Sequence, residues 1–225
     1  MKPRFSKVKK PLSKRQAHSL LVRLPFPSQC PNTMAETPST RILPLGTHAP
    51  EFELPDAHGE KFTLDDVRGP QGLMVMFVCN HCPFVVHLAE ALSRFAKEME
   101  TLGVGVVAIN SNDAEKYPAD SPEKMLAFAS QHDWTFPYLV DADQSIAQAY
   151  VAACTPDFYL FDGELKLTYC GQFDDARPRN SEPVTGSDLR EAVRAMLAGE
   201  SPLPNQRPST GCGIKWKPGN EPKLG

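Results

Sequence analysis

Two cysteines separated by two residues, in Cys79-Asn80-His81-Cys82, are the residues of this chain best suited to chemistry. A thiolate is a nucleophile, and two cysteines at this spacing can close a disulfide across one helical turn. A cysteine at the start of a helix also faces unpaired backbone N–H groups, which stabilise a thiolate. We therefore predict a redox pair in which Cys79 is the more exposed, attacking thiolate and Cys82 the more buried, resolving thiol.

A zinc site is the main alternative, because the same spacing occurs in zinc-binding proteins. The sequence contains no second Cys-x-x-Cys and no His-x-x-x-His that would complete a tetrahedral site. Zinc would have to use His81, His87 or the distant Cys212 as further ligands. We therefore expect neither a bound metal nor a cofactor. Cys212, between two glycines in what we expect to be a mobile tail, is a candidate third redox thiol.

The segments on either side of the pair predict where it lies in the fold. Residues 73–78 form a short, continuously apolar run, which predicts a buried strand. From Pro83 to about residue 101, apolar residues recur at the three- and four-residue spacing of an amphipathic helix. Proline suits the first turn of a helix, where its missing N–H costs nothing. The cysteine pair is therefore expected at a strand-to-helix junction.

The rest of the sequence predicts the elements around this junction. The Asp162-Gly163 turn between two apolar runs is the strongest hairpin signal in the chain. Strands that alternate with helices, followed by a hairpin and a closing helix, predict an α/β fold with a central mixed sheet flanked by helices and an N-terminal β-hairpin. We expect strands at 52–54, 61–64, 73–78, 104–109, 136–140, 157–161 and 165–169, and helices at 83–101, 122–131, 145–150 and 187–198.

Charge is distributed unevenly along the chain. Residues 1–33 contain eight Lys or Arg and no acid, whereas the remainder contains 16 basic and 27 acidic residues. A basic, proline-containing segment without an apolar period is not expected to fold alone. We therefore expect a disordered N-terminal extension at 1–43, one domain at 44–200 and an extended C-terminal tail at 201–225.

Composition also bears on partners and compartment. The basic segment has few aromatic residues among its charges, and no segment approaches the ~20 apolar residues that span a membrane. We therefore expect neither nucleic acid nor a membrane as a partner. Six cysteines in 225 residues are too few for a secreted disulfide scaffold, so the cytoplasm is the expected compartment. The composition of the N-terminal segment leaves an organellar transit peptide open.

Over about residues 44–200, the chain resembles the thioredoxin-like superfamily, in its redoxin and peroxiredoxin-like branch. The junction formed by Cys79-Asn80-His81-Cys82 and Pro83 carries most of this resemblance. Thr155-Pro156 is similar to the cis-proline segment that faces the cysteines of thioredoxins. The further matches to redoxins are residues 45–54, 79–85, 136–141, 147–150 and 211–217.

The resemblance implies roles for four residues beside the cysteines. Pro156 would hold the backbone of Thr155 against the pair and give an extended substrate a strand to pair with. Asn80 and His81 stand where thioredoxins have Gly-Pro. A partly positive His81 imidazole beside Cys79 would stabilise the thiolate, so we expect the pKa of Cys79 to lie below the ~7 of thioredoxin.

One departure from the branch concerns the peroxide site. Peroxiredoxins carry Pro-x-x-x-Thr-x-x-Cys, and aligning that cysteine with either Cys79 or Cys82 places neither Pro nor Thr correctly. No Arg stands near the strand expected at 157–161. We therefore favour a cytoplasmic thiol-disulfide oxidoreductase that acts on a protein disulfide, a small thiol or a peroxide, with a thiol compound as electron donor. A thiol peroxidase remains the main alternative, and a metal-binding or copper-delivery protein is a further one.

Overall fold

The computed structural model describes residues 36–39 and 43–221, which belong to one compact unit. The expectations for residues 1–35 lie outside the described residues. The strands are β1 (Glu36–Pro38), β2 (Glu53–Pro55), β3 (Lys61–Thr63), β4 (Gly72–Phe77), β5 (Val104–Asn110), β6 (Tyr138–Val140), β7 (Cys154–Thr155), β8 (Asp157–Asp162), β9 (Leu167–Gly171) and β10 (Thr210–Gly213). The helices are α1 (Leu64–Val67), α2 (Pro83–Thr101), α3 (Pro122–Gln131), α4 (Ser145–Ala149) and α5 (Ser187–Leu197), with a short 3-10 helix η1 (Pro118–Asp120).

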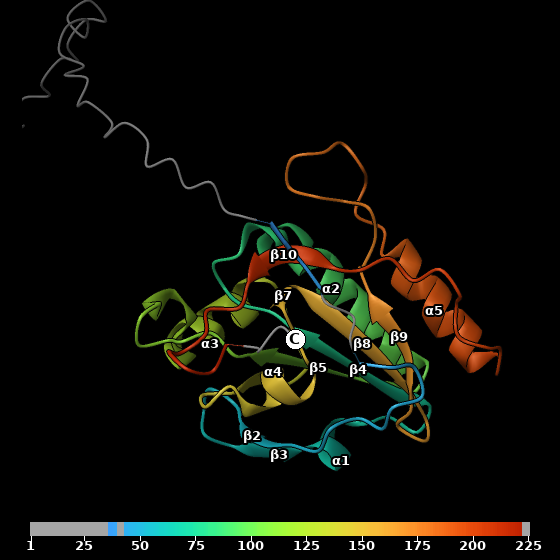
Figure 1. Cartoon of the computed structure of the whole chain (residues 1–225), viewed down its shortest axis with the longest axis horizontal. Helices are drawn as coiled ribbons and strands as arrows, with labels where there is room; N and C mark the ends of the chain where they lie inside the picture. Colours follow the sequence, from blue (N-terminus) through green and yellow to red (C-terminus); the bar gives the residue numbers. More distant parts are fainter. Residues whose placement is uncertain (1–35, 40–42, 222–225) are drawn as a thin grey trace, which may run out of the picture. The chain divides into compact units, whose positions relative to one another are not determined.

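A mixed sheet forms the centre of this unit (Figure 1). Strand β8 pairs antiparallel with β4 on one side and with β9 on the other, while β5 pairs parallel with β6. Strand β5 lies beside β4, where Val78 N–H donates to Ile109 O at 3.0 Å. Helices α2 and α5 lie on one side of the sheet, and α1, α4 and the β2-β3 hairpin lie on the other (Figure 1). The predicted α/β fold, with its hairpin before the cysteines, is confirmed.

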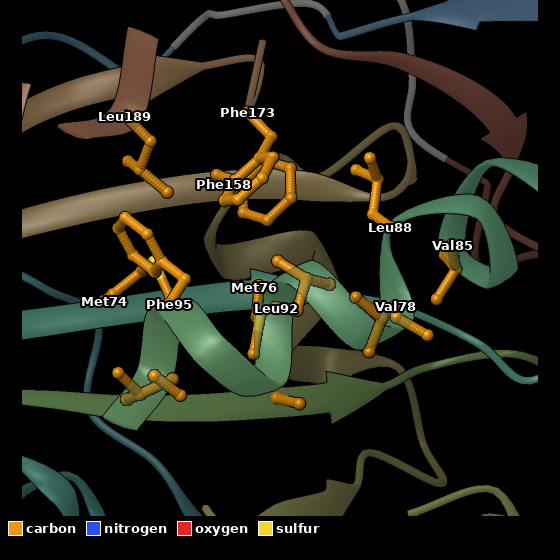
Figure 2. Packing of buried hydrophobic residues seen from close by; sticks show 14 of the residues in the cluster. Met74, Met76, Val78, Val85, Leu88, Leu92, Phe95, Phe158, Phe173 and Leu189 are labelled. Carbon is orange, nitrogen blue, oxygen red and sulfur yellow. The ribbon is translucent and has the colours of Figure 1, made fainter. Parts of the chain in front are cut away.

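Strand β4 is buried on both faces, which explains its continuously apolar sequence. On one face, Met74 and Met76 pack against the apolar side of α2, including Leu92 and Phe95 (Figure 2). Phe95 meets the ring of Phe173 edge to face, with the ring centroids 5.4 Å apart. This packing fixes the end of β4 and the start of α2, and therefore the loop that carries the two cysteines.

The end of the β8-β9 hairpin differs from the prediction. A two-residue turn at Asp162-Gly163 would place Leu165 in the returning strand, but β9 begins only at Leu167. Leu165 has a positive φ of 59°, and Asp162 N–H donates to Lys166 O at 3.0 Å. The turn is longer because the Asp162 carboxylate accepts from the N–H groups of Glu164 and Lys166 and stabilises a wider loop.

A second, three-stranded sheet has the order β1-β10-β7 (Figure 1). It corrects two expectations, because β1 lies within the segment 1–43 that we expected to be disordered and β10 lies within the expected tail at 201–225. Both strands are held by pairing with distant segments, a contact that local composition does not reveal. None of the helices in the described part of the chain is both long enough and apolar enough to cross a membrane.

Candidate active site

Cys79 and Cys82 lie in the loop between β4 and α2, as predicted. Cys82 is the N-cap residue of α2, and Pro83 occupies its first turn. Both cysteines are buried, with 1% and 0% of their surface exposed. Cys79 is predicted to be the more exposed of the two, but the structure encloses both thiols at the start of α2.

Thr155 is the residue that both cysteines contact. The Cys79 Sγ atom lies 3.3 Å from Thr155 Oγ1, and the Cys82 thiol lies 3.1 Å from Thr155 O, to which it can donate. The peptide bond between Thr155 and Pro156 is cis, as the resemblance implied. The segment carrying Pro156 therefore faces the cysteine pair.

The backbone of Thr155 is not a free strand edge. Strand β10 pairs antiparallel with β7, in a register that places Cys212 opposite Thr155 and Gly213 opposite Cys154. Strand β10 therefore already pairs with the backbone of Thr155, where we expected an extended substrate to pair.

Cys212 is the third cysteine of the site. It is 4% exposed and lies opposite Thr155, the residue whose carbonyl oxygen the Cys82 thiol contacts. The expectation of a mobile tail around Cys212 is wrong, because β10 is the middle strand of its sheet. Cys154 lies nearby on β7 but makes a different contact, at 3.6 Å from its Sγ atom to Pro156 O. The structure therefore brings Cys79, Cys82 and Cys212 together.

The negative charge of this cluster belongs on Cys82. Hydrogen bonds from the thiols of Cys212 and Cys79, followed by the backbone N–H of Val85, lower the pKa of Cys82. Burial and the contact with Thr155 O favour the protonated form of Cys82, but the interactions that lower its pKa outweigh them. We therefore place the thiolate on Cys82.

Cys79 has the opposite tendency. The hydrogen bond to Cys82, then burial, and then the nearby carboxylate of Asp120 raise the pKa of Cys79 well above its ordinary value. The prediction of a pKa below that of thioredoxin is therefore wrong. The unpaired N–H groups at the start of α2 do stabilise a thiolate, but they act on Cys82, which is the N-cap residue, and not on Cys79.

Asp120, on η1, is the residue of the site that the sequence did not indicate. Its carboxylate is 2% exposed and accepts from the N–H of Asn80 and from Asn112 Nδ2, each at 2.8 Å. His81 Nδ1 lies 2.7 Å from Asp120 Oδ2, so the imidazole pairs with Asp120. Burial opposes the ionisation of Asp120, but the hydrogen bonds from His81, Asn112 and Asn80 outweigh it and lower its pKa.

His81 and Asn80 therefore hold the loop to its surroundings. The hydrogen bond to Asp120 raises the pKa of His81 against the effect of burial, and the imidazole stacks on Tyr117 with the ring centroids 6.1 Å apart. The side chain of Asn80 accepts from Tyr138 OH at 3.0 Å and donates to Ala119 O at 2.9 Å. These contacts tie both side chains to η1 and its neighbours.

One group of residues at the site could also bind a metal ion. Cys79, His81 and Asp120 each offer a ligand atom, and these three atoms lie within 4.8 Å of one another. A sulfur, a nitrogen and an oxygen are the ligand types of zinc sites, where three protein ligands leave a fourth position for water or substrate. In this arrangement, however, the His81 nitrogen and the Asp120 oxygen already contact each other.

Known proteins with similar sequences are redox proteins. The model of the AhpC/TSA family matches residues 45–170. A Mycobacterium tuberculosis protein named "Putative peroxiredoxin Rv2521" is 32% identical over 135 residues, which cover 59% of this chain and 80% of that protein. The thiol-disulfide oxidoreductase ResA of Geobacillus kaustophilus is 29% identical over 129 residues, which cover 56% of this chain and 70% of ResA.

Solved structures extend this likeness. A hypothetical protein of Sinorhizobium meliloti, SMc02350, has 52% identity and a TM-score of 0.79, with 81% of this chain and all of that chain covered. Thioredoxin-like proteins at 18% and 21% identity, each with a TM-score of 0.51, share the fold. The predicted thioredoxin-like fold is therefore confirmed.

Proposed function

This chain belongs to the AhpC/TSA family and is a redoxin, and from that premise we propose that Cys79 and Cys82 cycle between a dithiol and a disulfide. One observation carries this assignment to the two residues: both sulfur atoms contact Thr155, Cys79 Sγ at 3.3 Å from its Oγ1 and Cys82 Sγ at 3.1 Å from its carbonyl oxygen, so that they lie side by side at the start of α2. Two sulfurs placed in this way need only a small displacement to form a disulfide.

The reaction is an exchange of one disulfide for another. In the reductive direction, the Cys79–Cys82 dithiol gives two electrons to a substrate disulfide, which leaves as two thiols while the bond between Cys79 and Cys82 forms. In the oxidative direction, the same exchange runs in reverse. The low pKa of Cys82 supplies a thiolate for the first attack, and the hydrogen bond between the two residues lets Cys79 complete the exchange.

The position of the thiolate favours a second function, a thiol peroxidase. A Cys82 thiolate would attack a hydroperoxide oxygen, so that the O–O bond breaks and yields an alcohol and Cys82 sulfenic acid. The thiol of Cys79 would then displace water and form the disulfide. A hydroperoxide is small enough to suit a sulfur as enclosed as Cys82. The standard Pro and Thr of the peroxiredoxin motif are absent from the sequence, which keeps this function second.

The partners are thiols and disulfides. We propose a small thiol or a dithiol protein as the electron donor and a protein disulfide as the substrate, in the reducing environment of the cytoplasm. The competing proposal is a metal-binding protein, in which Cys79, His81 and Asp120 would hold the ion. The same experiment tests it.

The decisive experiment measures disulfide reduction and peroxide consumption in parallel for the full chain. Insulin and hydrogen peroxide serve as the two substrates, with dithiothreitol as donor, and metal content is determined by mass spectrometry of the native protein. Cys79→Ser and Cys82→Ser should each abolish insulin reduction. Cys154→Ser, which changes a buried cysteine on β7 whose side chain contacts Pro156 O, is the matched control and should retain it.

The outcomes separate the three functions. Insulin reduction that survives both substitutions in the pair would overturn the dithiol cycle. Peroxide consumption that needs Cys82 but not Cys79 would assign the chain as a peroxidase with Cys82 as the attacking sulfur. Zinc or copper bound at one ion per chain, and lost with Cys79→Ser, would support the metal-binding function instead.

A further inference from the structure

Strand β10 is built to lie against the segment that faces the cysteine pair. Gly211 makes this approach possible, because a Cβ atom there would lie 2.0 Å from Thr155 O and 3.1 Å from the nitrogen of Pro156. No side chain fits at that distance. The sequence therefore brings the backbone of β10 directly onto the residues Thr155 and Pro156, where an extended substrate was expected to bind.

Strand β10 also places a thiol in the site. Cys212 lies opposite Thr155, and the Thr155 hydroxyl donates to Cys212 O at 3.5 Å. The Cys82 thiol lies 3.1 Å from Thr155 O, so that Cys212 and Cys82 meet at the same residue. A bound disulfide substrate would bring the same two features, a backbone in strand pairing and a sulfur beside the cysteine pair. On its outer edge, β10 pairs with β1, opposite Glu36 and Thr37, so that its position is fixed from both sides.

We propose that β10 is an internal substrate of the Cys79–Cys82 pair and that Cys212 forms a disulfide with Cys82. The proposal rests on the proposed function, since it takes the Cys79–Cys82 disulfide as its starting point. Cys212 would then be a third catalytic thiol, with Cys82 as its partner. Cys212 is a second resolving cysteine, which exchanges with Cys79 for the bond to Cys82.

The exchange balances without an additional oxidant. The Cys212 thiolate attacks the Cys82 sulfur of the Cys79–Cys82 disulfide, the bond between Cys79 and Cys82 breaks, and the bond between Cys82 and Cys212 forms. Cys79 leaves as a thiolate and takes up the proton that Cys212 has lost. The number of disulfides stays at one, and Cys79 becomes available as a thiol for a further exchange.

Disulfide mapping tests this inference directly. The full chain is oxidised with excess oxidised glutathione, alkylated, digested and mapped by mass spectrometry. We expect both Cys79–Cys82 and Cys82–Cys212 links in the wild type, and the Cys82–Cys212 link as the major intramolecular link in Cys79→Ser. A Cys79→Ser/Cys154→Ser double variant should keep that link, since Cys154 makes no part of it. Absence of a Cys82–Cys212 link from Cys79→Ser would overturn the inference.

The test separates this inference from the proposed function. In Cys212→Ser, the Cys79–Cys82 disulfide should still form. If it does not form there and Cys79→Ser still links Cys82 to Cys212, the dithiol cycle fails while the contact with Cys212 stands. If Cys79–Cys82 forms and Cys82–Cys212 never does, the dithiol cycle stands and the internal substrate fails.

Alanine substitutions at the two glycines of β10 test whether its close approach to Thr155 is needed for the Cys82–Cys212 link. In the Cys79→Ser background, Gly211→Ala should lower the yield of the Cys82–Cys212 link about tenfold, because the new methyl group must push β10 away from Thr155. Gly213→Ala should leave the yield within about twofold, since its Cβ would meet only the side chain of Thr37, 3.1 Å from Oγ1. Equal yields in the two variants would contradict the role of β10 pairing.

Discussion

The central sheet and the β1-β10-β7 sheet of this chain are held by different forces. Strand β4 is buried along its whole length and pairs with β8 over six residues, from Gly72–Asp162 to Phe77–Asp157. Strand β10 has the sequence Thr-Gly-Cys-Gly, and only two of its residues pair with β7. The first sheet is therefore stabilised by burial of large apolar side chains, and the second mainly by backbone pairing.

This difference assigns the two sheets different functions. The central sheet fixes Cys79 and Cys82, because the loop that carries them begins at the end of β4 and ends at α2. The smaller sheet brings Cys212 to them and covers them. Segments with few apolar contacts open at lower free energy than the core. We therefore expect β10 to detach without unfolding of the domain, which would give Cys82 access to a protein substrate.

The largest effect is expected in the core between α2 and the central sheet. Phe95→Ala should lower the free energy of unfolding by about 3–5 kcal/mol, because it leaves a cavity against Phe173 and the sheet. Urea denaturation measures the change. Val86→Ala, at a position of α2 that is 47% exposed, is the control and should stay within about 0.5 kcal/mol of the wild type. A much smaller loss of free energy of unfolding for Phe95→Ala would contradict the claim that apolar burial stabilises the central sheet.

An intermediate effect is expected where the two sheets meet, at Asp157. This carboxylate, the first residue of β8, is fully buried and accepts from Ser39 Oγ at 3.0 Å and from Tyr159 OH at 3.1 Å. Ser39 directly follows β1. Burial raises the pKa of Asp157 to about 6, although the hydrogen bonds from Ser39 and Tyr159 oppose this shift.

The sign of the pH dependence follows from the raised pKa. In the unfolded chain the pKa is ~3.9, so between that pH and about 6 the folded state holds a proton that the unfolded state releases. This contribution to stability is full below pH ~3.9 and is lost as the pH rises through about 6. Relative to Asp157→Asn, the wild type should therefore lose about 2 kcal/mol between pH 4.5 and pH 7.

Urea denaturation at the two pH values measures this loss, with Asp65→Asn as the control for an exposed acid. Parallel changes with pH in the wild type and in Asp157→Asn would show that Asp157 titrates normally and that burial at the boundary between the sheets costs nothing.

The parts of this molecule that the sequence could predict are those with local signals. The apolar run of β4 and the three-four spacing of α2 predicted both elements to within a residue, because the pattern of apolar residues in each segment reflects which of its residues are buried. Strand β10 has no such period, since two of its four residues are glycine. Its place depends on a partner, β7, that lies far away in the sequence.

The charge of the site could not be predicted for the same reason. The start of α2 acts on the loop alone, whereas Cys212 from β10 and Asp120 from η1 determine which of the two cysteines carries the negative charge. Asp120 carries no motif, and its contacts with Asn80, His81 and Asn112 arise only when η1 packs against the loop. The sequence around Cys79 and Cys82 was enough to identify them as the redox pair. It could not show which of the two is protonated, because that depends on residues far away in the sequence.

The smallest effect is expected from Arg207, which lies in the segment that leads into β10. Its guanidinium contacts the carboxylate of Asp175 at 2.6 and 2.7 Å and that of Asp188 at 3.1 Å, and the side chain is 55% exposed. These ion pairs hold the segment near the start of α5. Exposed ion pairs contribute little, so Arg207→Gln should speed the alkylation of Cys82 by iodoacetamide by less than about fivefold.

Salt distinguishes this contribution from a change in packing. At 1 M NaCl the Debye length falls to ~3 Å, so the ion pairs of the wild type are weakened and its alkylation rate should approach that of Arg207→Gln. The matched control is Arg194→Gln, since Arg194 forms a comparable exposed pair with Glu200 at the end of α5, away from β10. In this variant, iodoacetamide should alkylate Cys82 at the wild-type rate. An increase well above fivefold for Arg207→Gln would mean that ion pairs, and not the pairing of β10 with β7, keep the cysteines covered.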